Sequence, residues 1–352
     1  MPYAPDPFVL SPNGVDPKTV PCKTLYTGQK MPVIGMGTFG NDRYTGDQIA
    51  EAVKGGISVG YRLIDCASVY GNEKEIGLAL HEVFSSGLVK REELFVSSKV
   101  WNDKHGPGDT IKSCEQTLKD LGLDYLDLYL VHWPFPNYHA PFCTIDSRNP
   151  DSRPFFADDF MVCWEQMEQL VRRGLVRAIG TSNVTKPKME AILQRAHIRP
   201  AVTEMELHPY FQQKELMAYM LSRNIQPIGF CPIGSPCRPD RDHAATDRSE
   251  LQDPILLKIA QAHGVHPAVI CVKWAVQNGQ IPIPLSLTPR NYLSNLRSVT
   301  EDPLTSDEME ALSGIDCDMR LVKGHVFLWP GANDWQDLWD VNGVIDRSGW
   351  TK

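Results

Sequence analysis

The sequence lacks the features that would direct the chain to a membrane, to the outside of the cell or to nucleic acid. It contains no run of 18 apolar residues, and its first residues have neither the basic start nor the apolar stretch of a signal peptide. Acidic residues outnumber basic ones, 43 to 35, which disfavours a polyanionic partner. We therefore expect a soluble, cytoplasmic protein that binds neither membrane nor nucleic acid.

The pattern of a disulfide-stapled or metal-dependent protein is also missing. The nine cysteines are odd in number, scattered and never spaced as Cys-x-x-Cys, so we expect reduced thiols. A metal-dependent barrel hydrolase would need His and Asp ligands at the first strand, yet the first histidine is His81. We expect no metal site. With 352 residues, 42% of them apolar, the chain can build a large core without disulfides or metal ions.

From about residue 31 the sequence repeats a short apolar run, a polar or glycine-containing turn and a longer amphipathic segment. This alternation predicts strands and helices in turn. In segment 158–173, apolar residues recur every three or four positions, as in a helix that packs on a sheet. The predicted strands are 32–38, 61–67, 94–100, 126–132, 177–182, 201–207, 226–231 and 281–287.

Mostly apolar strands that alternate with helices indicate a parallel sheet covered by helices, either closed into a barrel or left open. The periodicity alone leaves closure undecided. The count of eight, the absence of a Gly-x-Gly-x-x-Gly turn after the first strand and the position of the reactive residues favour a barrel. We predict a (β/α)8 TIM barrel at 25–317, an N-terminal arm at 1–24, and long loops at the C-terminal rim at 133–157 and 232–252. The tail at 318–352 is expected to contribute to a substrate pocket.

Titratable side chains follow three consecutive predicted strands. Asp65 and Tyr70 follow the second strand, Lys99 ends the third and His132 ends the fourth. Singly, each has an ordinary structural explanation: a helix cap for Asp65, a solvated strand end for Lys99 and a satisfied buried histidine for His132. Their shared position on successive units instead indicates one site at the rim of a barrel.

These four residue types suit the reduction of a carbonyl group by hydride. The reaction needs a proton donor at the oxygen, while a cofactor carbon faces the carbonyl carbon. Tyrosine has an ordinary pKa of about 10, so we expect the ammonium of Lys99 to lower the pKa of Tyr70. Asp65 would hold the lysine in place, and His132 would orient the substrate oxygen.

Several motifs resemble the aldo-keto reductase family, in particular the reductases of aldoses and xylose. Residues 64–73 (IDCASVYGNE) are similar to the family's Asp-x-Ala-x-x-Tyr-Gly-Asn-Glu signature. Residues 96–101 and 126–134 resemble its lysine and histidine strands, and 180–183 resembles the turn that holds the nicotinamide carboxamide. The separations of 5, 29 and 33 residues between Asp65, Tyr70, Lys99 and His132 also match the family's catalytic tetrad.

The resemblance implies a barrel that binds an extended nicotinamide cofactor across its rim, with Tyr70 as acid or base. It also implies a set of binding residues for the cofactor and the substrate. For the cofactor these are Gly37, Thr38, Phe39, Asp65, Ser182, Asn183, Glu204, Phe230, Cys231, Ile233, Ser235, Ser286, Leu287, Asn291 and Asn295. For the substrate they are Trp101, Trp133, His132 and Trp329. Without the tetrad, the turn at 181–183 would read as a helix cap and Phe230 as a core aromatic.

The sequence departs from the family pattern at several cofactor positions. Glu204 and Phe230 stand where most relatives have glutamine and tyrosine, and Cys237 stands where many have an acid that clasps a loop over the pyrophosphate. Leu285 and Asn291 replace the lysine and arginine that grip the 2′-phosphate of NADP. We therefore expect NAD(H) to be preferred, with NADP(H) possible because Arg290 lies next to Asn291.

The substrate is expected to be a small polyhydroxylated carbonyl or its alcohol, such as an aldose and alditol pair. The predicted rim combines flat aromatic rings with polar groups, which suits stacking on and hydrogen bonding to a sugar. The polar groups are Asn137, Tyr138, His139 and His325. The alternative is a binding, structural or regulatory subunit that has the family's fold and no turnover. We expect a monomer or a weak homodimer.

Overall fold

The computed structural model describes residues 10–351 apart from 41 and 141, and in it all eight predicted segments contain a strand of one parallel sheet. The order of the sheet is β10-β9-β8-β7-β6-β5-β4-β3, so each strand pairs with its neighbour in the chain. The strands are β3 (Met36–Gly37), β4 (Leu63–Asp65), β5 (Phe95–Val100), β6 (Leu126–Val131), β7 (Val176–Ser182), β8 (Val202–Glu206), β9 (Gln226–Phe230) and β10 (Ile281–Pro282).

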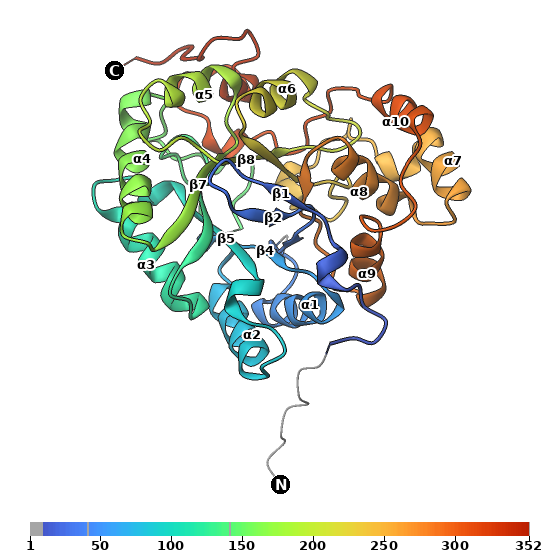
Figure 1. The fold of residues 1–352 in the computed structure, drawn as a ribbon. Helices are drawn as coiled ribbons and strands as arrows, with labels where there is room; N and C mark the ends of the chain where they lie inside the picture. Colours follow the sequence, from blue (N-terminus) through green and yellow to red (C-terminus); the bar gives the residue numbers. More distant parts are fainter. Residues whose placement is uncertain (1–9, 41, 141, 352) are drawn as a thin grey trace.

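The sheet closes on itself where its first and last strands meet. The amide of Gly35 donates to the carbonyl of Pro282 at 3.0 Å, and the amide of Gly37 donates to that of Pro284 at 3.3 Å. The approach is close: a Cβ on Gly37 would lie 2.8 Å from the carbonyl oxygen of Ile283, so glycine is required there. The predicted (β/α)8 barrel is confirmed, and Figure 1 shows the strands ringed by helices.

The helices cover the outer face of the barrel. The predicted segment 158–173 corresponds to α4, which buries Phe160, Cys163, Trp164 and Met167. Helix α1 begins at a capping box in which Thr45 and Gln48 satisfy each other's backbone amides. The helices are α1 (Gly46–Val59), α2 (Glu73–Ser85), α3 (Asp109–Leu121), α4 (Ala157–Arg172), α5 (Lys186–Leu193), α6 (Lys214–Ser222), α7 (Pro254–Ala262), α8 (Pro267–Gln277), α9 (Pro289–Arg297) and α10 (Ser306–Ser313).

A short hairpin that the sequence pattern did not predict covers one end of the barrel. Strands β1 (Cys22–Thr24) and β2 (Lys30–Pro32) pair antiparallel and lie across the middle of the ring in Figure 1. Leu25 and Met31 are buried against apolar side chains of the barrel strands. Residues 1–9 of the expected N-terminal arm lie outside the described residues.

The opposite end carries the long loops and the tail. The tail includes two 3-10 helices, His325–Phe327 and Trp335–Trp339. Its apolar residues, among them Phe327 and Leu338, pack with Trp133 and Phe135 of the loop after β6. The buried ammonium of Lys188 on α5 holds the tail through the carboxylate of Asp340, at 2.7 Å.

Among the described residues, no single helix has the length and apolar composition to cross a membrane. The two helices α7 and α8 meet the criterion only when taken together, and they are bent by 92°.

Candidate active site

Three successive strands of the barrel bring the predicted tetrad together at the rim. Asp65 ends β4, Tyr70 lies in the 3-10 helix Ser68–Tyr70, Lys99 lies in β5, and His132 directly follows β6. The ammonium of Lys99 donates to Asp65 Oδ2 at 2.5 Å and to the Tyr70 hydroxyl at 3.5 Å. Its third proton goes to the backbone carbonyl of Cys66 at 3.1 Å. The lysine is fully buried, and Glu204 Oε2 also lies 3.3 Å from its Nζ atom.

Burial keeps the Tyr70 hydroxyl protonated. Burial raises the pKa of Tyr70 above its ordinary value; Lys99 opposes this effect, whereas Asp65 and Glu204 add to it. Lys99 therefore acts in the expected direction, but the cost of burying a phenolate exceeds the effect of the ammonium, so the pKa of Tyr70 is raised overall. Burial also lowers the pKa of Lys99, but the carboxylates of Asp65 and Glu204 raise it well above the ordinary value. The site thus pairs a neutral phenol with an ammonium cation.

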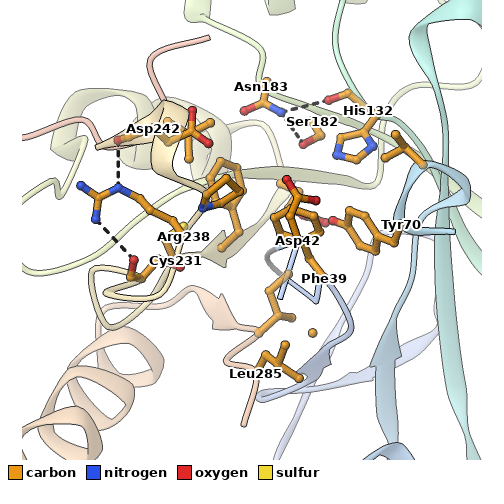
Figure 2. Close-up of a pocket in the computed structure, with 18 of the residues that line it drawn as sticks. Phe39, Asp42, Tyr70, His132, Ser182, Asn183, Cys231, Arg238, Asp242 and Leu285 are labelled. Carbon is orange, nitrogen blue, oxygen red and sulfur yellow. Dashed lines mark hydrogen bonds between the residues drawn. The ribbon is translucent and has the colours of Figure 1, made fainter. Parts of the chain in front are cut away.

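His132 is neutral in this environment. Burial lowers its pKa well below the usual value, and the charges of Lys99 and His139 lower it further. Its ring lies edge-on to Tyr70, with centroids 5.8 Å apart, and to Trp101, with centroids 5.2 Å apart. Figure 2 shows the His132 ring and the Tyr70 hydroxyl on the same side of the pocket. A neutral imidazole there can donate a hydrogen bond to an oxygen that Tyr70 protonates.

Most of the predicted cofactor residues line this same pocket. The buried Asp65 and Glu204 line it, as do residues of the loops after β9 and β10. The predicted residues that line it are Gly37, Thr38, Phe39, Asp65, Ser182, Asn183, Glu204, Phe230, Cys231, Ile233 and Ser235. The catalytic and substrate candidates that also line it are Tyr70, His132, Trp101 and Trp133.

Several predicted residues lie elsewhere. The pocket reaches Leu285 but does not include Ser286, Leu287, Asn291 or Asn295. Trp329 is also absent from its lining: it is buried in the tail, and its indole N–H donates to the carbonyl of Ser348 at 3.0 Å.

The polar rim also differs from the sequence expectation. Asn137 is occupied with the backbone, because its amide donates to the carbonyls of Arg153 and Phe327 at 2.8 and 2.7 Å. Tyr138 and His325 do not line the pocket, whereas His139 does.

The pocket residues fit a nicotinamide carboxamide. Within the described part of the chain, Asn183 Oδ1 and Glu204 Oε2 are buried without a hydrogen-bond partner. Both are acceptors, and a carboxamide carries two N–H donors. Asn183 adopts a positive φ of 58° and is fixed by donating its amide to the carbonyl of His132 at 3.0 Å. These residues are therefore suited to hold the ring beside Tyr70.

Comparisons with known proteins agree with this geometry. The sequence profile described as "Aldo/keto reductase family" matches residues 33–316. The chain belongs to the aldo/keto reductase family. It is 42% identical over 305 residues to aldo-keto reductase family 1 member A1 of Bos taurus, which covers 86% of this chain and 91% of that protein. It is 38% identical to an aldo/keto reductase of Synechocystis sp., over 90% and 95% of the two chains.

A crystal structure of an aldo-keto reductase of Bombyx mori in complex with NADP has the same fold. The two superpose with a TM-score of 0.77 at 30% identity, over 88% of this chain and 96% of that one. Together with the family match, this makes the protein a nicotinamide-dependent oxidoreductase that reduces carbonyl groups.

The loops after β3 and β9 are held together by residues that the sequence pattern did not predict. Cys237 supplies no clasp, but Arg241 in the same loop pairs with Asp42 at 2.7 Å, and Arg43 lies 3.4 Å from Asp240. Both ion pairs join the loop after β3 to the loop after β9. The partners are about 200 residues apart in the sequence, so no local pattern could have revealed them.

A buried histidine ties the tail of the reductase to the barrel. His208 Nε2 lies 3.1 Å from Glu206 Oε1, and its Nδ1 lies 2.8 Å from Glu250 Oε2. Glu206 also accepts from the backbone amides of Leu321 and Val322, at 2.6 and 2.8 Å. Since Val322 lines the pocket, this cluster positions one wall of the site.

Proposed function

We propose that Tyr70 donates the proton, Lys99 and Asp65 tune it, and His132 orients the substrate oxygen in the reduction of a small carbonyl compound. The contact between the buried Lys99 ammonium and the Tyr70 hydroxyl carries this proposal. When bound, the nicotinamide cofactor supplies the hydride. Tyr70 transfers its proton to the carbonyl oxygen, and Lys99 stabilises the phenolate that forms. Neutral His132 hydrogen-bonds the same oxygen and holds the carbonyl in line.

The cofactor is proposed to extend from this pocket across the rim. Ser182, Asn183 and Glu204 would hold the carboxamide, and Phe230 would stack on the ring. The pyrophosphate would lie beside Cys231, Ile233 and Ser235, whose loop has positive φ angles at Cys231 and Ser235. The adenosine would lie beyond Leu285, near the start of α9, where the remaining predicted residues are found.

We propose a preference for NAD(H) over NADP(H). Leu285 lines the end of the pocket with an apolar side chain, and Asn291 is uncharged. A 2′-phosphate would lack charge-assisted partners there, whereas Asn291 suits a ribose hydroxyl. The related Bombyx mori reductase is in complex with NADP, so NADPH is the competing cofactor to measure.

The proposed substrate is a small polyhydroxylated carbonyl. The pocket joins aromatic faces, Trp101 and Trp133, to the polar side chains of His139, Asp42 and Arg241. Aromatic faces stack on sugar rings, and the polar groups can bind hydroxyls. We propose that the 318–352 tail shapes this pocket, since Phe327 lines it and packs against Trp133 with centroids 4.4 Å apart.

A panel of aldoses, hydrophobic aldehydes, ketones and polyols, assayed with NADH and NADPH, tests these proposals. We expect the highest kcat/KM with an aldose or its alditol and with the non-phosphorylated cofactor. A hydrophobic aldehyde that surpasses every sugar by orders of magnitude would refute the substrate proposal, and an advantage for NADPH would refute the cofactor proposal. Cofactor binding without turnover of any carbonyl would favour a binding subunit. We also propose that the protein is a monomer or weak homodimer, which sedimentation would test.

A further inference from the structure

The interior of the site holds one ammonium group between two carboxylates. Glu204 on β8 places its Oε2 atom 3.3 Å from Lys99 Nζ, and Asp65 lies on the other side of the same nitrogen. Among the described residues, the ammonium donates to Asp65, to Tyr70 and to the carbonyl of Cys66. Glu204 Oε2 is left without a hydrogen bond among the described residues.

An ionised carboxylate in that position would be poorly stabilised. Glu204 is 2% exposed, so water does not solvate it, and the charge of Lys99 is already compensated by Asp65. The residues paired with Glu204 on the neighbouring strands, Ser182 on β7 and Ile228 on β9, are uncharged, and Tyr70 is a neutral phenol. Burial and the nearby Asp65 raise the pKa of Glu204 to about 8, and Lys99 offsets only part of this.

We propose that Glu204 stores the proton of the reaction: it is protonated while the site holds reduced cofactor and ionised while the site holds oxidised cofactor. The inference rests on the proposed placement of the nicotinamide ring beside Glu204. Its chemical basis is that the ring is neutral in the reduced form and cationic in the oxidised form. Glu204 can be neutral beside the neutral ring and negatively charged beside the cationic ring.

The proton balance of the step is complete within the site. The carbonyl carbon receives the hydride with its electron pair, and the Tyr70 O–H bond breaks to protonate the carbonyl oxygen. A proton of Lys99 passes to the Tyr70 oxygen, and the proton of Glu204 passes to Lys99. The result is an alcohol, a neutral Tyr70, a charged Lys99 and an ionised Glu204 that faces a cationic ring. Glu204 regains a proton from solvent when the oxidised cofactor leaves.

Calorimetric titration of cofactor binding tests the proposal without turnover. At pH 7, heats of binding in buffers of low and high ionisation enthalpy give the number of protons released. The wild-type protein is expected to release up to one proton more on binding NAD⁺ than on binding NADH. As the pH rises towards 8, the affinity for NAD⁺ should then increase by up to tenfold per pH unit. Glu204→Gln should remove the difference and flatten the pH dependence.

Glu73→Gln is the matched control. Glu73 is also a buried carboxylate with a raised pKa, but it accepts from Ser98 and Thr117 and does not line the pocket. The Glu73→Gln variant should show the same difference in proton release between NAD⁺ and NADH as the wild-type protein. Equal proton release with both cofactors, or a difference that persists in Glu204→Gln, would overturn the inference while leaving the proposed reductase function intact. Failure of the wild-type protein to bind either cofactor would overturn both.

Discussion

The histidine that ties the tail to the barrel should make the stability of the protein depend on pH. Both nitrogens of the His208 ring face carboxylate oxygens, so its contacts require the doubly protonated imidazolium. Burial lowers the pKa of His208, but Glu250 and Glu206 raise it more, to about 9, from an ordinary value of 6.5. Each factor of ten in proton affinity corresponds to about 1.4 kcal/mol, so proton binding favours the folded state by on the order of 3 kcal/mol.

The direction of the pH dependence follows from the raised pKa. The contribution of His208 is fully present below about pH 6.5, where the unfolded chain is also protonated, and it is lost as the pH rises towards 9. His208→Gln should therefore lower the free energy of unfolding by about 3 kcal/mol at pH 6. At pH 10 this loss should be smaller by on the order of 3 kcal/mol, because His208 is then neutral in the wild-type protein as well. Because Glu204 also has a raised pKa, the quantity to compare is the difference between variant and wild type at each pH.

Urea unfolding followed by tryptophan fluorescence at pH 6, 7.5 and 9.5 measures this effect. His81→Gln is the control, because His81 is exposed on α2 rather than buried between carboxylates. If the cost of His208→Gln were the same at pH 6 and pH 9.5, the charged state assigned to His208 would be refuted.

Three further variants test other parts of the site. Lys99→Met should lower carbonyl reduction by at least about a hundredfold, because no cation would stabilise the Tyr70 phenolate; kcat measured across pH checks this. Asp42→Asn should break the pair with Arg241 and speed cofactor release about threefold, as expected for a partly exposed ion pair, and stopped-flow fluorescence would detect it. Leu285→Lys with Asn291→Arg should raise kcat/KM for NADPH relative to NADH roughly tenfold to a hundredfold, since charge-assisted hydrogen bonds contribute about 1.5–3 kcal/mol. An unchanged cofactor ratio would contradict the alignment of those two positions.

The barrel elements and the clustering of the four tetrad residues could be predicted from the sequence because both leave local patterns. The eight strands are short apolar runs between amphipathic segments, and the tetrad residues lie at or shortly after the ends of three successive strands. In a parallel barrel that position alone brings side chains to one rim, which is why a one-dimensional pattern predicted a three-dimensional cluster.

The features that escaped prediction depend on contacts between distant parts of the chain or on burial. The pairing of Asp42 with Arg241 spans 199 positions, and β1 and β2 have three residues each, too few to show a period. The pKa of Tyr70 depends on how far the folded chain excludes water, which residue identity does not give. The same limit applies to Trp329, which was expected at the rim but is buried among the apolar residues of the tail.

Tyr70→Phe tests the central claim most directly, because it removes the proton donor and keeps the ring. Phe39 packs against Tyr70 with centroids 5.1 Å apart, a contact that phenylalanine retains. Cofactor binding, followed by quenching of tryptophan fluorescence, should stay near the wild-type affinity. Carbonyl reduction with the best substrate of the panel should fall by at least about a hundredfold, the usual effect of removing a general acid. Turnover near the wild-type rate would contradict the assignment of Tyr70 as the acid and, with it, the proposed mechanism.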